Sequence, residues 1–251
     1  MTTSPHTQFK NDCATELAAQ AADVDLAVSS REWMNRSNAR KYSYHFEWLG
    51  RPIIQYPQDM VAMQQIIWAV QPELIIETGI AHGGSLILSA SMLELNAACA
   101  GPSNATVLGI DIDIRAHNRA AIEAHPMGKR IQMLEGSSIS PEIIEQVHVA
   151  AEGKKSILIF LDSNHTHDHV LAELDAYAKL ASLNSYCVVF DTVIEDMPAS
   201  MFSDRPWGPG NNPKTAVRYW LTSHPEFEVD HALESSLLIT VAPGGYLKRV
   251  A

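Results

Sequence analysis

The chain has 251 residues, of which 46% are hydrophobic and 19% are charged, so it has enough apolar mass for one large globular core. This composition excludes disordered, collagen-like and coiled-coil proteins. The formal net charge of −11 argues against a nucleic-acid-binding or anionic-membrane-binding surface, because both need a basic footprint.

Cysteine usage and hydropathy indicate the cellular compartment. Cys13, Cys99 and Cys187 have no metal-binding or redox spacing and suit a reducing environment. Residues 1–10 are polar and contain no apolar signal segment, and the longest apolar run, 157–161, is too short to span a bilayer. We therefore expect a cytoplasmic protein without a membrane span.

The first 60 residues predict a helical and aromatic extension. Residues 1–12 indicate a loose polar tail, and apolar side chains at helical spacing predict an amphipathic helix over 14–28. We expect the exposed apolar side of this helix to favour a homo-oligomer. Residues 31–56 hold six aromatic side chains, which either strap the core or form a lid and substrate wall. A further helix is predicted over 60–70.

After residue 72, short apolar runs alternate with helical patterns. Such βαβ units favour a parallel sheet covered on both faces. The fold prediction is an α/β, Rossmann-like, doubly wound sheet of about seven strands, mostly parallel with an antiparallel closing strand, plus the N-terminal helical extension. The predicted strands are 74–77, 106–110, 131–134, 156–161, 186–190, 227–230 and 237–241, the last two as an edge hairpin. The predicted helices are 85–96, 116–124, 141–150, 167–183 and 213–223.

A glycine-containing loop, Glu77-Thr78-Gly79-Ile80-Ala81-His82-Gly83-Gly84-Ser85, follows the first strand of this sheet. It permits a tight turn and close approach of the backbone to a ligand, with Ser85 as a helix N-cap. Its G-x-x-x-G-G spacing differs from a dinucleotide loop, and it lacks the lysine of a Walker loop. The acidic Glu77 disfavours an anionic ligand. A cationic nucleoside fits better, and an ordinary strand-to-helix turn is the alternative.

Polar residues also follow the next two strands. Asp111 can accept both hydroxyls of a ribose, and the corner at 135–138 suits an adenine edge. A nucleoside pocket without a phosphate site points to S-adenosylmethionine (SAM), whose sulfonium is positive. The predicted cofactor-binding residues are Glu77, Gly79, Ala81, Gly83, Gly84, Ser85, Asp111, Ser137, Ser138 and Asp162.

The densest polar cluster, 162–169, follows the fourth strand, and Asp191 and Thr192 follow the fifth. Neighbouring strands would bring Asp162 and Asp191 together, and carboxylates, an amide and water make a good Mg²⁺ site. We predict Asp162, Asp191 and Thr192 as metal ligands and His165 as a general base. Helix capping is the alternative for any single residue here.

The histidines His165, His167 and His169 leave a metal hydrolase open as a second class of function. Their spacing is one residue short of the metallo-β-lactamase-like signature, and βα alternation contradicts the antiparallel sandwich of those enzymes. The spacing of a non-haem iron oxygenase is absent from this cluster. His167 and His169 better suit the helix surface or the surroundings of the site.

Several segments in chain order carry a resemblance over about residues 40–249. They are Trp48-Leu49-Gly50 with Gln55 and Asp59, the loop 77–85, Gly109-Ile110-Asp111-Ile112-Asp113, Leu161-Asp162-Ser163-Asn164-His165, 189–197, 206–217 and 243–248. Together they resemble the cephalosporin hydroxylase and rhamnosyl O-methyltransferase family.

The resemblance implies a Rossmann-like methyltransferase domain that binds SAM, with Asp162 and Asp191 holding Mg²⁺ and His165 as the base. Relatives often carry two adjacent acids after the fifth strand, whereas this chain has Phe190-Asp191-Thr192. Mg²⁺ would then be held more weakly, or Glu195 or Asp196 would substitute. The family name also includes the word hydroxylase, but this sequence contains no pattern for an oxidative cofactor site.

We therefore predict a SAM-dependent, Mg²⁺-assisted O-methyltransferase acting on a hydroxyl of a sugar or an antibiotic-like or natural-product-like small molecule. Residues 1–60 would form the extension and lid, and 61–251 the SAM-binding Rossmann-like methyltransferase domain. The predicted acceptor-binding residues are Tyr44, Trp48, His165 and Trp207. Segment 204–213 forms either a movable lid or a rigid surface loop. The alternatives are a metal-dependent hydrolase or hydroxylase using the histidine cluster, and a SAM-binding protein without turnover.

Overall fold

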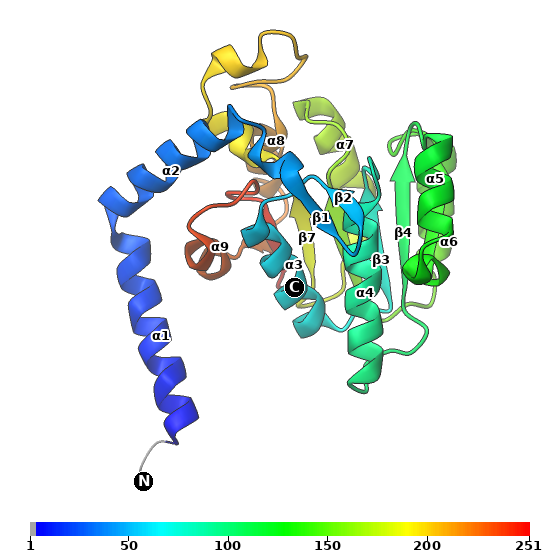
Figure 1. Cartoon of the computed structure of the whole chain (residues 1–251), viewed down its shortest axis with the longest axis horizontal. Coiled ribbons are helices and arrows are strands. Elements are labelled where there is room, and N and C mark those ends of the chain that lie inside the picture. The colour runs from blue at the N-terminus through cyan, green and yellow to red at the C-terminus, as the bar shows by residue number, and fades with distance from the viewer. Residues whose placement is uncertain (1–3) are drawn as a thin grey trace.

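Figure 1 shows the computed structural model of the chain, which describes residues 4–251. A central sheet has helices on both faces, and two N-terminal helices form an arm that projects from it. Within the described residues, no helix has the length and apolar character needed to cross a membrane. The helices are α1 Pro5–Ala22, α2 Val24–Asn38, α3 Pro57–Val70, α4 Gly84–Ala98, α5 Ala116–Glu123, α6 Pro141–Ala151, α7 His167–Tyr177, α8 Pro213–Leu221 and α9 His231–Leu237.

The central sheet has seven strands in the order β5-β4-β3-β6-β7-β9-β8. The first five in this order run parallel, and β9 runs antiparallel to both β7 and β8. The prediction of a mostly parallel α/β sheet with N-terminal helices is confirmed. The seven strands are β3 Leu74–Thr78, β4 Thr106–Asp111, β5 Ile131–Glu135, β6 Ile157–Leu161, β7 Tyr186–Val189, β8 Phe227–Val229 and β9 Tyr246–Arg249; β1 Phe46–Trp48 and β2 Arg51–Ile53 form a separate antiparallel pair.

Both faces of the sheet are buried, which explains why its central strands are continuous apolar runs. Successive side chains of β3 alternate between two buried clusters. Ile75 belongs to the cluster that includes Met63 of α3, whereas Ile76 belongs to the cluster that includes Leu174 of α7 and Trp220 of α8. The helices after β3 and β6 therefore cover opposite faces, as a doubly wound sheet requires.

The strand register aligns the carboxyl ends of the central strands. Thr78 of β3 pairs with Ile110 of β4 and with Leu161 of β6, and Leu161 pairs with Val189 of β7. The strand order reverses at β3, which lies between β4 and β6, and ligands of open α/β sheets bind at such a point. The residues brought into one row by this register are Gly79, Asp111, Asp162 and Phe190.

The N-terminal arm differs from the predicted tail and single helix. A helix already begins at Pro5, where Ser4 accepts a hydrogen bond from the backbone N–H of Thr7. Asp23 separates the two helices and caps α2 by accepting from the N–H of Leu26. No side chain of α1 is buried. Residues 1–3 of the predicted tail lie outside the described residues.

The predicted closing strand over 237–241 is wrong. Asp230 accepts from the N–H of Leu233 and caps the short helix α9 over the start of this region. The N–H of Val241 then donates to the buried carboxylate of Asp59 at the start of α3. Residues 237–241 are therefore attached to α3 through Asp59, and β9 is the strand that pairs with β7.

The aromatic segment packs mainly as a strap over the core. The ring of Tyr42 meets those of Trp33, Phe46 and Tyr56 at centroid distances of 5.0–5.3 Å. Trp48 donates its indole N–H to Ser91 of α4 at 3.0 Å. Of the two alternatives for 31–56, these contacts favour a strap over the core. Tyr44 is the aromatic residue of this segment that lines a pocket.

Candidate active site

A pocket of about 500 Å³ opens at the carboxyl edge of the sheet. Its inner wall comes from the ends of β3, β4, β6 and β7 and the loops that follow them. Its outer wall comes from two segments remote in sequence, 38–44 at the end of α2 and 197–207 before α8, with residues 52–55 between the walls.

The glycine loop after β3 lies tightly against the loop after β6. Gly79 has a φ of +88°, and a Cβ atom at this position would lie 2.0 Å from the backbone oxygen of Asp162. The carboxylate of Asp111 accepts hydrogen bonds from the N–H groups of Ile80 at 2.8 Å and Ala81 at 3.3 Å. The end of β4 therefore braces the loop after β3.

The predicted cofactor residues divide into two sets. Glu77 is buried away from the pocket, where it accepts from Ser85 and Ser89, and burial raises its pKa to about 7. Ser138 is buried and its hydroxyl bonds to the ring of His169 at 3.0 Å. The pocket-lining members are Gly79, Ala81, Gly84, Ser85, Asp111 and Asp162, and those outside the lining are Glu77, Gly83, Ser137 and Ser138.

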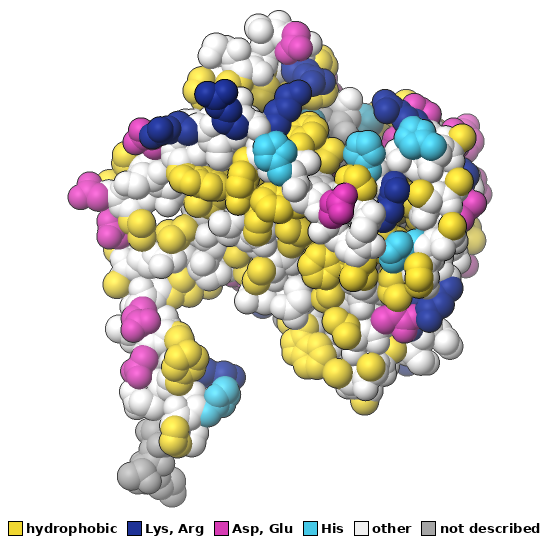
Figure 2. Space-filling view, in the orientation of Figure 1, with side chains coloured by type: hydrophobic (Ala, Val, Ile, Leu, Met, Phe, Trp, Pro, Cys, Tyr) yellow, Lys and Arg dark blue, Asp and Glu magenta, His cyan; other side chains and the backbone are white. Residues whose placement is uncertain are grey.

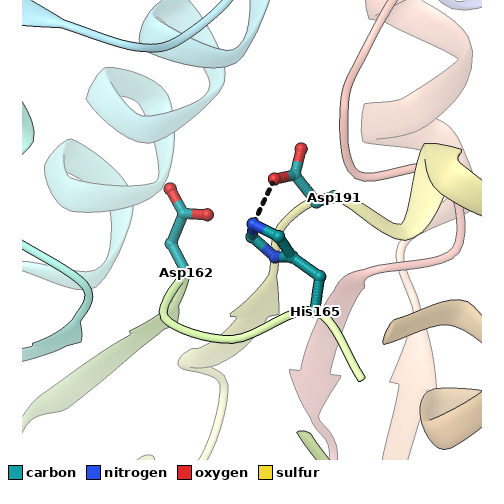
Figure 3. A group of neighbouring side chains, drawn as sticks. All are labelled: Asp162, His165 and Asp191. Carbon is teal, nitrogen blue, oxygen red and sulfur yellow. Dashed lines mark ion pairs between the residues drawn. The ribbon is translucent and has the colours of Figure 1, made fainter. Parts of the chain in front are cut away.

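Asp162, His165 and Asp191 come together at the centre of the inner wall (Figure 3). One ligand atom from each lies within 4.8 Å of the other two, and Nε2 of His165 is 3.2 Å from Oδ2 of Asp191. Asp191 has a left-handed φ of +55°, a conformation that costs a non-glycine residue free energy and recurs at functional sites. The group therefore joins the ends of two adjacent parallel strands.

The electrostatics of this group favour a cation. Burial, followed by the carboxylates of Asp191 and Glu77, raises the pKa of Asp162 well above its usual value. Gln55 donates its Nε2 to Asp162 at 3.1 Å, while its own Oε1 is buried without a hydrogen-bond partner. Two carboxylates beside a buried, unpartnered amide oxygen form an oxygen-rich donor set, and this set fits Mg²⁺ with water as further ligand.

Glu195 and Asp196, the expected substitutes for a second acid, are engaged elsewhere. Glu195 accepts hydrogen bonds from the side chain of Asn212 and from backbone near it, and Asp196 forms an ion pair with Lys214. Both acids therefore hold the start of α8 and the turn before it, and neither belongs to the group of Asp162, His165 and Asp191.

Thr192 and the other two histidines also lie outside the group. Thr192 is fully buried and donates to the backbone oxygen of Pro243 at 2.9 Å. His167 bonds through Nδ1 to Thr215, and His169 faces a buried serine and glutamate network. Across residues 4–251, Asp162, His165 and Asp191 form the one group of three such potential ligands, so the three-histidine centre of a hydrolase is not assembled.

The outer wall contributes aromatic and basic side chains. Trp207 meets the ring of His165 edge-on at 4.9 Å between centroids, and the guanidinium of Arg205 lies 5.5 Å from the Trp207 ring. Lys41 and Tyr44 line the same wall, whereas Trp48, a predicted acceptor residue, does not. Sequence reasoning missed Gln55, Lys41 and Arg205 as pocket residues. Gln55 stood within a segment of the family resemblance and Arg205 within segment 204–213, the candidate lid, whereas Lys41 carried no signal.

Comparison with known proteins gives one family and several relatives. The family model described as Rhamnosyl O-methyltransferase/CmcI matches residues 40–250. A rhamnosyl O-methyltransferase of Mycobacterium bovis (strain BCG / Pasteur 1173P2) is 29% identical over 196 residues, which are 76% of this chain and 73% of that protein. The rhamnosyl O-methyltransferase of Mycobacterium leprae (strain TN) is 29% identical over 205 residues, covering 80% and 82% of the two chains.

Solved structures share the fold at low sequence identity. A CmcI structure described with Mg and SAM has a TM-score of 0.58 and 16% identity, covering 83% of this chain and 78% of its own. The O-methyltransferase TomG from Streptomyces achromogenes, in complex with SAM, has a TM-score of 0.52 and 15% identity, covering 91% of both chains. These similarities show a Rossmann-like methyltransferase fold.

Proposed function

Because the chain belongs to the rhamnosyl O-methyltransferase/CmcI family of SAM-dependent O-methyltransferases, we propose that it methylates a hydroxyl of a sugar or natural-product-like small molecule with the help of Mg²⁺. The observation that carries this proposal is the group of Asp162, His165 and Asp191 beside the glycine loop. A methyl donor and a hard cation would thereby meet at one edge of the sheet.

The inner wall suits the donor. SAM supplies a methyl group on a positively charged sulfonium, and the acidic groups of this wall complement that charge. Gly79 lets the loop backbone approach the ligand closely, and the carboxylate of Asp111 holds the loop in place. A structure of the related CmcI is described with Mg and SAM, which supports the same pair of cofactors here.

Asp162 and Asp191 are the residues proposed to hold Mg²⁺. When bound, the cation would lower the pKa of the acceptor hydroxyl by Lewis acidity. Asp162 is kept in position by Gln55 and by a bond from its own N–H to the Thr78 carbonyl at 2.9 Å. A carboxylate fixed in this way needs little rearrangement on binding a cation.

His165 is proposed to accept the proton of the hydroxyl. Asp191 lies 3.2 Å from Nε2 of this ring, so its carboxylate would orient the imidazole and stabilise the imidazolium formed by proton transfer. Trp207 packs against the same ring and limits its movement. Holding donor and acceptor at attack distance between the two walls can supply about 7–11 kcal/mol of the barrier reduction.

Calorimetry combined with methyl-transfer assays tests this proposal. Wild-type protein should bind SAM and not NAD, and transfer should depend on added Mg²⁺. Asp162→Asn and His165→Gln should each lower the transfer rate by about 100-fold or more while the SAM affinity stays within a few-fold. Asp113→Asn is the matched control for Asp162→Asn, since Asp113 also follows a parallel strand of the sheet, β4, but is 70% exposed and pairs with Arg115.

Three outcomes would contradict the proposal. Equal loss of SAM affinity and transfer in Asp162→Asn would make Asp162 a structural residue. Transfer that survives complete removal of divalent ions would exclude the proposed role of Mg²⁺. SAM binding without transfer across a broad acceptor panel would indicate a binding protein without turnover.

A further inference from the structure

We propose that the methyl acceptor is an anion, a hydroxylated small molecule whose acidic group is bound by Lys41 and Arg205 in the outer wall. This inference rests on the proposed methyl transfer and specifies its substrate class. It follows from the distribution of charge in the pocket, from the pairing state of the two basic side chains and from their position relative to His165.

Charge in the pocket is divided between its two walls. The acidic side chains of the pocket, Asp111, Asp162 and Asp191, all belong to the inner wall. Lys41 and Arg205 are the Lys and Arg residues among the described lining residues, and both belong to the outer wall. This basic wall exists in a chain with a net charge of −11, so it is a local feature.

Figure 2 shows where positive charge gathers on the surface. Lys and Arg side chains gather over the end of α2 and over the adjacent lobe that precedes α8. The sequence places Arg36, Arg40 and Lys41 at the end of α2 and Arg205 in the lobe. Such a concentration of positive charge at a pocket mouth attracts anionic ligands and raises their association rate.

The two basic side chains of the pocket are weakly engaged in ion pairs within the protein. Lys41 forms none of the ion pairs found among residues 4–251, and its Nζ lies 6.0 Å from the ring of Tyr44. Arg205 has one acidic neighbour, Asp204, at 4.0 Å with the carboxylate side chain 83% exposed. In contrast, Lys214 is closely paired with Asp196. Lys41 and Arg205 therefore keep hydrogen-bond donors for a ligand.

The geometry around Trp207 relates the anion to the reacting hydroxyl. The ring of His165 stands perpendicular to this indole ring at 4.9 Å between centroids, and the guanidinium of Arg205 lies over the indole at 5.5 Å. An acceptor ring lying along Trp207 would place a hydroxyl at His165 and an acidic substituent at Arg205. Arg suits this role, because its planar guanidinium binds a carboxylate or phosphate through two hydrogen bonds.

The methionyl carboxylate of SAM is a second possible source of the same charge. It would reach the outer wall only if the amino acid end of SAM extended away from the glycine loop. Two N–H groups of the loop already donate to Asp111, but the inner wall still offers the methionyl carboxylate the N–H groups of Gly84 and Ser85 in the first turn of α4. The proposed cation and sulfonium sites lie on the same side. We therefore assign Lys41 and Arg205 to the acceptor, and the test separates the two sources.

Calorimetry on protein loaded with S-adenosylhomocysteine (SAH) and Mg²⁺ tests the proposal with two matched pairs of probes. The pairs are glucuronic acid against glucose, and 3,4-dihydroxybenzoate against its methyl ester. The wild-type protein should bind the acidic member of at least one pair about tenfold more tightly, and added salt should reduce this preference. Arg205→Gln and Lys41→Gln should each weaken binding of the acidic member up to about fivefold, with no change for the neutral member.

Lys154→Gln is the matched control, because this exposed lysine lies outside the pocket lining. It should leave every affinity unchanged. No preference in either pair, or variants that weaken acidic and neutral members equally, would overturn the proposal. SAH affinity that falls in step with the acidic probe would assign the basic residues to the cofactor carboxylate instead. Wild-type protein that binds no SAH would contradict the proposed function itself, and that result is distinct from all of these.

Discussion

The two walls of the pocket are built in different ways. The inner wall follows from strand register: once β3, β6 and β7 pair, Asp162 and Asp191 must lie at the same edge. The outer wall consists mainly of turns and loops outside the sheet, with exposed side chains such as Tyr44 at 58%. The comparison indicates that the sheet fixes the proposed chemistry, whereas recognition of the acceptor depends on segments that can change without disturbing the sheet.

Two glycines, Gly79 in the inner wall and Gly210 just beyond the outer-wall segment 197–207, give the largest expected difference. Gly79 and Gly210 both have a φ of +88°, but a Cβ atom at Gly79 would meet the backbone of Asp162, whereas nothing lies within 4 Å at Gly210. Gly79→Ala should lower the free energy of unfolding by at least about 3 kcal/mol, because strain and a backbone clash add. Gly210→Ala should cost only the strain, about 1 kcal/mol.

Urea unfolding of both variants measures this difference. Gly79→Ala should also weaken Mg²⁺ binding, since the clash displaces the residue that carries the Asp162 carboxylate. Equal destabilisation by the two substitutions would show that the close contact between the loops after β3 and β6 is unimportant, and the distinction between the walls would lose its physical basis.

Glu77 tests the electrostatic cost of burying an acid in β3, beneath the inner wall. Its pKa is raised from 4.5 to about 7 by burial, so the folded protein binds this proton more tightly than the unfolded chain does. The free energy of unfolding should therefore fall by about 3 kcal/mol as pH rises from 4.5 to 7. Glu77→Gln should abolish this part of the slope, because the hydroxyls of Ser85 and Ser89 can donate to or accept from an amide.

The measurement is the difference in free energy of unfolding between variant and wild type at pH 4 and pH 8. The variant should gain relative to the wild type at the higher pH. Parallel pH profiles of the two proteins would contradict the assignment of the raised pKa to Glu77.

Thr192 gives a smaller effect than Gly79 or Glu77, and its substitution distinguishes a buried structural residue from a metal ligand. Thr192→Val removes the donor to the Pro243 carbonyl and should cost about 1–2 kcal/mol of stability. Because the hydroxyl is already engaged and lies outside the pocket lining, the Mg²⁺ affinity should stay unchanged. If a titration shows that Thr192→Val binds Mg²⁺ clearly more weakly than the wild type, Thr192 is a metal ligand and belongs to the inner wall.

Much of the fold could be predicted because it depends on local patterns. The alternation of apolar runs and helical periodicity indicated the parallel sheet, and the rule that parallel strands share a carboxyl edge brought Asp162 and Asp191 into proximity. The run at 237–241 misled the prediction, because its environment is set by Asp59, more than 180 residues away in sequence. No local pattern reports such a contact.

The details of the site were less predictable for similar reasons. Thr192 adjoins Asp191 in sequence, but the left-handed backbone of Asp191 turns the chain, and the Thr192 side chain reaches Pro243 instead. Lys41 and Arg205 line the same wall because segments 38–44 and 197–207 both lie at the carboxyl edge of the sheet. The division of the chain at residue 60 and the expected homo-oligomer stay predictions.

The insertion of β9 between β7 and β8 has a consequence for synthesis on the ribosome. The strand that precedes Asp191 has one edge open until residues 246–249 become available. The roughly 60 residues between the ends of β7 and β9 take about 3 to 12 s to translate at ~5–20 residues per second. For that interval a nascent chain exposes an apolar strand edge that can pair wrongly, so slower elongation through this region should increase aggregation of the newly made protein.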